Sequence, residues 1–543
     1  QDAGKRAQVW KILAQCIEEG RDSTERVRFI ANAKRGKDAE PRAVLQLFWF
    51  SAPPQDKPAL LLDADASPDL LQRMYPGAEL QRFDLKPNAE VLQVTDHVFS
   101  KAALLDREGV NNRGKRQSLA NLVRWEVFRD RQQGRRGVLA AATKEVVQAM
   151  FEDAGRISPD MTKAQMRDAM FGQELHGARW IWFGPASLGL NTWKDFGTVL
   201  EIGREELPLD SLEQQARAFW GDTGDPLQEV APDASGRRLL PRIPLPVTMA
   251  DGSGWAIEGT AHPDSRTREL QMQGRECAAR QTLERLRLAN APEPKRVVIC
   301  TSVPVPGLPV DRLVTFEDLA PDRLESALAE AGGVLRVSAA GLAQDAPETF
   351  PTEQAAKDWL KAGGRDQVNG GEPVILDTIS GAPPINPLRV RLRLKGQRGP
   401  LPTPALVIGH GDPRAIAEAQ LGPLSMFELV DPVKDAREGP QPAQEAPQVR
   451  KRLIWVPKSQ QVTSALMAQH IACRREVPEV IPWPGAVVGV FPSPLARIRL
   501  PRRYPERTGF SRPYMEGVHS GKLDLAGSGK GVRCFPANAH KGP

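Results

Sequence analysis

The residues best suited to chemistry gather in a polar loop, 184–191, that directly follows a short apolar run. Its glycines, Gly184 and Gly189, allow a ligand to approach the backbone closely. Ser187 and Asn191 carry side chains that can bond phosphate oxygens or the edges of bases. Loops of the same composition are also common in α/β proteins that bind nothing there. The loop is therefore a candidate site for phosphate or nucleic acid, but its composition alone does not establish that it binds either.

A second candidate segment, 281–287 (QTLERLR), carries arginines behind a glutamine. Gln281 and Arg285 are four residues apart, so on a helix they project from one face. A guanidinium fixed there, with Arg287 beside it, can reach the γ-phosphate of a nucleotide and stabilise the charge of phosphoryl transfer. The alternative is a salt-bridged, solvated helix face, which a run of charges usually forms.

A third segment joins an apolar run, 59–62, to an acidic turn that contains Asp63 and Asp65. The run predicts a short buried strand, and Pro68 predicts the first turn of a helix that reaches residue 74. One interpretation of the turn is a plain helix start, because Asp and Ser are good N-caps. The other is a polar connection that couples nucleotide state to the domain that follows.

A parallel sheet is the element that would bring these segments to one place. Apolar runs alternate with helical patterns over about 59–320, which indicates an α/β layer whose ligands bind at the carboxyl ends of the strands. The predicted strands are 59–62, 137–142, 180–183, 198–203 and 296–301, with a hairpin around 251–252. The predicted helices are 68–74, 143–151, 209–220 and 266–288.

Composition restricts the class of protein. At 543 residues the chain exceeds one hydrophobic core, and 41% hydrophobic with 26% charged residues predicts a mainly folded protein. The net charge of +6 fits a nucleic-acid partner without requiring one. Five scattered cysteines and histidines without metal-ligand spacing argue against disulfides or a metal site and favour the cytoplasm. No apolar run is long enough to span a bilayer, so no membrane partner is expected.

Together the segments resemble the C-terminal portion of superfamily 2 helicase-like proteins, most closely those of bacterial plasmids and phages. The run LLLDADAS resembles the family's LDATA-like linking turn, and 138–144 resembles the strand and helix start of its second RecA-like domain. Residues 183–195 resemble its FG-x-x-RG-x-N-x-[FW]-x-D loop, and 281–287 its Q-x-x-x-R-x-R element. The resemblance covers about 40–320.

The resemblance implies a role for each matching residue. It makes Arg285 and Arg287 an arginine-finger pair and Gln281 a sensor, and it places Asp63, Asp65 and Gly184 on the nucleotide side. It implies nucleic-acid contacts for Lys144, Ser187, Gly189, Asn191 and Trp193. Trp193 would stack on a base, although a tryptophan there is more often a core anchor. The implied cofactors are ATP and Mg²⁺, held mainly by residues outside this chain, and the implied partners are DNA and an upstream ATPase domain or partner chain.

The resemblance also predicts the domain organisation, a RecA-like parallel sheet with flanking helices followed by a mixed α+β accessory region. The predicted parts are a remnant of the first motor domain with its linker (1–120), the second RecA-like domain (121–325), the accessory domain (326–431), a linker (432–450) and a Pro/Arg/Gly-rich C-terminal region (451–543). Because the chain starts with Gln1 and not Met, we expect a piece of a longer protein.

The sequence departs from the family at its phosphate-binding element. No GxxxxGK[ST] motif occurs, and the late GSGKG at 527–531 lacks the spacing, the hydroxyl residue and a preceding strand. Leu188 replaces an arginine of the family loop, and Glu284 replaces a glycine. On its own, the chain is therefore not expected to hydrolyse ATP.

Three functions remain open from the sequence. The favoured one is the C-terminal part of a DNA helicase or translocase of a mobile genetic element. The second is a non-enzymatic nucleic-acid-binding replication protein with a degenerate helicase fold, and the third is a protein-interaction scaffold. Arg-rich stretches at 124–136 and 497–507 would bind phosphates in the first two cases, or form ordinary solvated surface.

Overall fold

The computed structural model describes most of the first 430 residues and one later strand, namely residues 2–33, 40–50, 53, 60–61, 65–81, 83, 85–184, 189–369, 387–396, 401–430 and 518–524. Within these residues, no helix is both long and apolar enough to cross a membrane. In the same part of the chain, no three His, Cys, Asp or Glu side chains meet in a way that could hold a metal ion.

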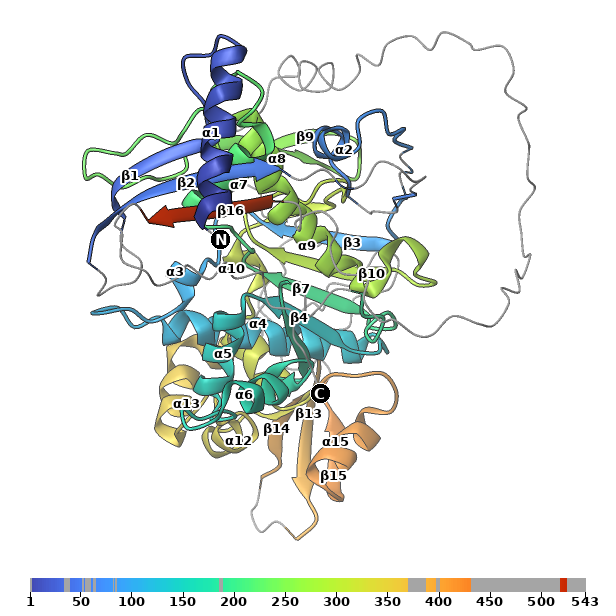
Figure 1. Ribbon diagram of the computed structural model, residues 1–543. Coiled ribbons are helices and arrows are strands. Elements are labelled where there is room, and N and C mark those ends of the chain that lie inside the picture. The colour runs from blue at the N-terminus through green and yellow to red at the C-terminus, as the bar shows by residue number, and fades with distance from the viewer. Residues whose placement is uncertain are drawn as a thin grey trace, which may run out of the picture.

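A seven-stranded sheet forms the centre of the molecule, with the strand order β11-β3-β10-β7-β4-β6-β5 (Figure 1). All neighbouring strands pair in parallel except β5 and β6, which are antiparallel. The strands are β3 (Ala89–Val94), β4 (Val138–Ala142), β5 (Glu174–Leu175), β6 (Ala178–Trp182), β7 (Thr198–Ile202), β10 (Lys295–Cys300) and β11 (Arg312–Val314). Buried parallel strands covered on both faces are the arrangement that apolar runs such as VLAAA predict.

Each face of this sheet carries its own apolar core. One core combines alternate sheet residues with the helices α3 (Lys101–Leu104), α4 (Arg113–Gln132), α5 (Lys144–Asp153), α6 (Lys163–Met170) and α10 (Phe316–Leu319). The other combines the remaining sheet residues with the hairpin β8 (Arg242–Thr248) and β9 (Gly254–Thr260), helix α9 (Glu276–Leu283) and the short turns η2 (Glu284–Leu286) and η3 (Leu288–Asn290). The alternation along the strands therefore sends successive side chains into opposite cores.

A second layer lies on the α9 side of the sheet. Helix α2 (Pro68–Met74) packs with α7 (Leu209–Trp220) and α8 (Ser265–Gly274) around Leu70, Phe219 and Leu270. Strand β2 (Arg42–Phe50) pairs with β1 (Val27–Ala33) and β16 (Val518–Asp524), and α1 (Asp2–Glu18) covers this small sheet. Figure 1 shows α1, β1, β2 and β16 together at one end of the molecule.

An accessory region follows the main sheet and is mixed α and β. Its antiparallel sheet has the order β12-β14-β13-β15, and its helices pack on Trp125 and Phe128 of α4. The strands are β12 (Val334–Arg336), β13 (Leu388–Leu394), β14 (Thr403–Val407) and β15 (Leu424–Leu429). The helices are α11 (Arg323–Glu330), α12 (Ala339–Asp345), α13 (Glu353–Trp359), η4 (Leu360–Gly364), α14 (Arg365–Asn369) and α15 (Pro413–Leu421).

Several predicted elements are confirmed. Helix α2 begins at Pro68, with the Ser67 side chain accepting from the amide of Leu70, as the Ser-Pro start predicts. Helix α7 and the β8–β9 hairpin occupy their predicted positions. The predicted α/β fold with a largely parallel sheet is therefore correct in its general class.

Other predictions need correction. The strand expected at 59–62 is not formed at its two described residues, Leu60 and Leu61, and Leu60 is 84% exposed. Strand β3, which was not among the predicted strands, lies between β11 and β10 in the main sheet. The single long helix expected at 266–288 is broken into α8, α9 and two short turns.

Candidate functional site

The break in the long helix decides how the arginine segment is presented. Arg275, between α8 and α9, has a φ of −115° and a ψ of −69°, outside helical values. Its guanidinium is buried and donates to the carbonyl oxygen of Thr260 at 2.7 Å and to the carboxylate of Glu206 at 3.2 Å. Helix α9 then ends at Leu283, and Arg285 lies in the tighter turn η2. Tertiary contacts, rather than local helix propensity, therefore set the direction of this segment.

Arg287 holds an unusual backbone conformation. Its φ of 56° and ψ of 51° place it in the left-handed region, which residues other than Gly, Asn and Asp seldom adopt. Leu286 and Leu288, on either side, are fully buried in the core beneath the sheet. These two anchors fix the turn and leave the Arg287 side chain exposed. Strain of this kind costs on the order of 1–3 kcal/mol and clusters at functional sites.

The arginine segment and the polar loop meet in space. Arg285 Nη1 donates to the carbonyl oxygen of Leu190 at 3.4 Å. Arg287 donates to the side-chain oxygen of Asn191. The two segments singled out for chemistry thus form one site, although they are far apart along the chain.

Arg285 and Arg287 give this site two positive charges. Among the described residues, no carboxylate lies within ion-pair distance of Arg285 or Arg287. The Nε atom of Arg285 is buried and has no hydrogen-bond partner in that part of the chain. Burial, with a smaller contribution from Arg287, lowers the pKa of the Arg285 guanidinium below its usual value. A bound anion would offset this unfavourable electrostatic energy.

Gln281 lies on α9, but its relation to Arg285 differs from the expected one. The four-residue spacing crosses from an α-helix into η2, so the two residues do not share a regular helix face. Within the described part of the chain, no hydrogen bond joins the Gln281 side chain to Arg285 or to the loop. The structure therefore brings Arg285 and Arg287 to the loop and leaves Gln281 on the preceding turn.

The loop glycines adopt the conformations for which glycine is needed. Gly184 has a φ of +107° and Gly189 a φ of +73°. A Cβ atom at Gly189 would meet nothing within 4 Å, so the backbone there is open to a ligand. Ser187 and Leu188, which lie between them, are outside the described residues.

Trp193 is a core residue. It is 5% exposed and belongs to the core that contains Phe183, Leu286 and Leu288. Its ring also lies edge-on to Phe171, with 6.3 Å between the ring centroids. The core-anchor alternative describes this residue, and the ring as placed offers no face to a stacking base.

Lys144 is the first residue of α5, two positions after the end of strand β4. Its side chain is exposed, with Nζ 5.6 Å from the ring centroid of Trp182. Thr143 is the N-cap of α5, but its side chain makes no capping bond, and its buried Oγ1 has no partner among the described residues. A helix N-terminus with a hydroxyl and a lysine has the chemistry to bind a phosphate group.

Asp65 of the acidic turn has a different contact from the one expected. The Asp65 side chain is 4% exposed and accepts a hydrogen bond from Arg280 Nη1 at 2.9 Å. This carboxylate is engaged with α9 and is not presented to a nucleotide. Asp63 lies outside the described residues.

The Arg-rich stretch 124–136 also needs correction, because most of it is packed in α4 between the sheet and the accessory region. Arg124 pairs with Glu348, and Arg129 is buried. Trp125 and Phe128 from the same stretch join the accessory core. The stretch is therefore an internal joint between two parts of the molecule, and 497–507 lies outside the described residues.

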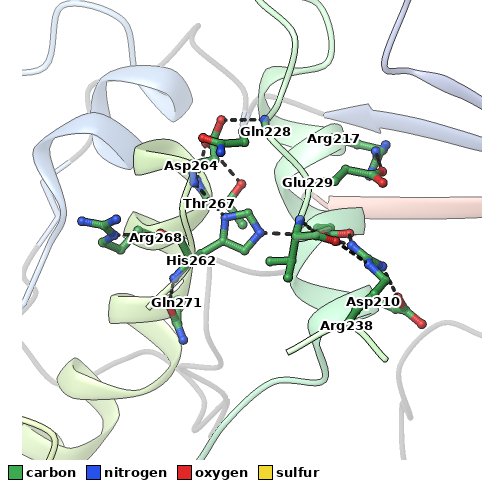
Figure 2. Close-up of polar contacts among 12 residues, drawn as sticks. Asp210, Arg217, Gln228, Glu229, Arg238, His262, Asp264, Thr267, Arg268 and Gln271 are labelled. Atoms are coloured by element: carbon green, nitrogen blue, oxygen red, sulfur yellow. Dashed lines mark hydrogen bonds and ion pairs between the residues drawn. The ribbon is translucent and has the colours of Figure 1, made fainter. Parts of the chain in front are cut away.

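A separate polar cluster, not anticipated from the sequence, surrounds His262 (Figure 2). The buried imidazole accepts from the Asp264 amide at 3.2 Å through Nδ1, and its Nε2 lies 3.4 Å from Glu213 Oε1. Burial alone would raise the pKa of Glu213, but hydrogen bonds from His262, Arg238 and the Val230 amide lower it to about 2. Asp264 caps α8 by accepting from the Thr267 amide at 3.0 Å.

This His262 cluster resembles an acid–base site only in its residue types. The His262 side chain is fully buried, so no substrate can reach it without unfolding the surrounding segment. Its members join α7, the loop after α7 and the start of α8 through hydrogen bonds within the chain. We therefore assign it a structural role.

No family model matches this chain, and no curated protein or solved structure matches it either. The functional assignment therefore rests on the residues and their geometry.

Proposed function

We propose that this chain supplies the second motor domain of an ATP-dependent DNA helicase or translocase, of the type found in plasmids and phages. The observation that carries the proposal is the contact of Arg285 and Arg287 with Leu190 and Asn191, made by two guanidinium groups that have no carboxylate partner among the described residues. Two arginines that contact a glycine-containing loop and have no carboxylate within ion-pair distance among the described residues fit a polyphosphate better than a neutral ligand.

In this mechanism the chain contributes charge and position rather than the nucleotide cradle. An upstream domain or partner chain would hold ATP and Mg²⁺, since the sequence contains no GxxxxGK[ST] element. Arg285, which the packed core beneath it holds in place, would stabilise the charge that develops on the transferred phosphoryl group. Arginine fingers in phosphoryl transfer are worth about 10³–10⁵ in turnover.

The nucleic-acid grip in this proposal comes from the carboxyl edge of the sheet. Lys144 at the N-terminus of α5 would bind a backbone phosphate, with the Thr143 hydroxyl as a second donor. Gly189 would let the strand approach the loop, and Asn191 would orient both the loop and Arg287. Trp193 has no direct role in this version of the site.

The experiment that tests the proposal measures two affinities on the chain alone. Isothermal titration with pyrophosphate should detect binding that Arg285→Ala and Arg287→Ala each weaken about tenfold or more. Lys144→Ala should instead weaken single-stranded DNA binding and reduce its salt dependence. Arg242→Ala, which removes an exposed arginine of β8, is the matched control and should change neither affinity.

The second candidate, a non-enzymatic nucleic-acid-binding protein, is favoured by one observation, the absence of the phosphate-binding motif from the sequence. It predicts DNA binding without any pyrophosphate binding at the arginines. Equal pyrophosphate titrations for the wild type and both arginine variants would support this candidate and remove the motor proposal.

A further inference from the structure

Arg280 joins three separate parts of the chain one residue before Gln281. Its Nη1 donates to the Asp65 carboxylate at 2.9 Å and to the carbonyl oxygen of Pro306 at 3.3 Å. The side chains of Arg280 and Asp65 are 19% and 4% exposed, so the ion pair is largely shielded from solvent. Shielded pairs are sensitive to the loss of either partner, because the remaining charge stays buried.

Asp65 is itself held on the same face of α9. Cys277, three residues before Arg280, places its Sγ atom 3.8 Å from the Asp65 carbonyl oxygen. Downstream of Asp65, the Ser67 hydroxyl donates to Glu269 of α8 at 3.0 Å. Helix α2 follows at once and packs into the α7–α8 layer through Leu70 and Met74. Residues 65–74 are therefore docked against the helices that lead into the arginine segment.

A competing carboxylate lies on the other side of Arg280. Glu284 is four residues further along, the spacing at which an arginine and a glutamate on a helix can pair. It is the first residue of η2, the turn that carries Arg285. Burial raises the pKa of Glu284, and the positive charge of Arg280 opposes that increase most, followed by a hydrogen bond from the Leu288 amide and by the charge of Arg287. Arg280 thus lies between an acid on the docked turn and an acid at the base of the arginine segment.

We propose that Arg280 is a positioning residue for the arginine segment, and that Asp65 controls it by holding the guanidinium away from Glu284. While Asp65 holds Arg280, η2 keeps the geometry in which Arg285 and Arg287 contact the loop. When the Asp65–Arg280 pair is broken, Arg280 pairs with Glu284 and pulls the start of η2 out of that geometry. The positioning of η2 by Asp65 and Arg280 does not depend on the proposed function, whereas the control of catalysis by this pair rests on it.

Hydrogen–deuterium exchange of the whole chain tests the inference without any ligand. Asp65→Asn should accelerate exchange of the amides in 284–291 about fivefold or more, because η2 loses its fixed position. Asp65→Glu should retain most of the protection. The matched control is Asp69→Asn, which removes an exposed acid from the first turn of α2 and should leave 284–291 unchanged.

A double variant separates positioning from general loss of structure. In Asp65→Asn/Glu284→Gln the competing acid is absent, so protection of 284–291 should return to near the wild-type value. Protection in Asp65→Asn equal to that in Asp69→Asn would overturn the inference, and so would a double variant as unprotected as the single one. The readout needs no nucleotide, so failure here is distinct from failure of the arginines to bind pyrophosphate.

Discussion

Arg287 donates a hydrogen bond to the side-chain oxygen of Asn191, a residue 96 positions earlier in the chain. The contact depends on a left-handed backbone conformation at Arg287, which the buried Leu286 and Leu288 maintain. It connects the loop between β6 and β7 with the turn that precedes β10, so the loop and the arginines form one structural unit. A change in either segment should therefore alter the other.

Replacing Arg287 by Gly and by Ala separates its backbone from its side chain. Both variants lose the guanidinium, so both should lose pyrophosphate affinity to the same extent. Arg287→Gly should be about 1 kcal/mol more stable than Arg287→Ala, because glycine adopts a positive φ without strain. Chemical denaturation of the two variants measures this difference. An Ala variant as stable as the Gly variant would mean that the turn relaxes and that Arg287 is not held in strain.

Trp193 should behave as a core residue and not as a base-stacking platform. Trp193→Ala should destabilise the protein by about 3–5 kcal/mol, the usual cost of removing a buried large aromatic side chain. Trp193→Phe should keep most of the stability and leave single-stranded DNA affinity unchanged within about twofold. Affinity that falls about tenfold in a stably folded Trp193→Phe protein would restore a stacking role.

Glu201 should make stability depend on pH. It is fully buried in β7, neither carboxylate oxygen has a hydrogen-bond partner, and burial raises its pKa to about 8. The unfolded chain releases this proton near its ordinary value of 4.5, whereas the folded chain retains it up to about 8. The folded state is therefore favoured below pH 4.5 and loses this advantage as the pH rises to about 8.

Glu201→Leu removes that dependence. The midpoint of thermal unfolding of the variant, relative to the wild type, should rise steadily between about pH 5 and pH 8. A difference in midpoint that stays constant over this range would show that the Glu201 carboxyl is ionised or solvated in the folded protein.

The contribution of the His262 cluster to stability should depend on pH in the opposite direction to that of Glu201. Hydrogen bonds lower the pKa of Glu213 to about 2, from an ordinary value of 4.5, despite its burial. The stabilisation is fully present above the unfolded value and is lost as the pH falls through about 2. Glu213→Gln should be less stable than the wild type at pH 7, and the gap should narrow below about pH 4. A gap that does not change on acidification would contradict the lowered pKa.

The parts of the fold that the sequence predicts are those controlled by local pattern. Helices α2 and α7 have the predicted bounds because local sequence patterns specify them, a Ser-Pro start for α2 and a regular hydrophobic period for α7. Strand β3 was not predicted, since AEVLQV mixes polar and apolar residues, and Gln93 is buried only because its amide donates to the carbonyl oxygens of Thr301 and Val303. Contacts of this kind come from segments about 200 residues away and leave no local signal.

The candidate site also has features that the sequence predicts and features that it does not. The glycines at positions 184 and 189 predict a positive φ from residue type alone, and the arginines are recognisable from their spacing. The break at Arg275 depends on buried contacts with Glu206 and Thr260, which come from distant parts of the chain. The local pattern of charged helix residues continues through Arg275 and therefore predicts one unbroken helix. Likewise, Arg124 and Arg129 of α4 look solvated in sequence, yet Arg124 pairs with Glu348 of the accessory region and Arg129 is buried.

The most direct test of the account is the rate of DNA-stimulated ATP hydrolysis when this chain is combined with the upstream nucleotide-binding domain or partner chain that the proposal requires. The account predicts that Arg285→Ala lowers the turnover number about a thousandfold or more while DNA affinity stays within about twofold of the wild type. It also predicts that Arg242→Ala leaves both quantities unchanged. Turnover by Arg285→Ala equal to that of the wild type would contradict the assignment of this chain as the second half of a motor.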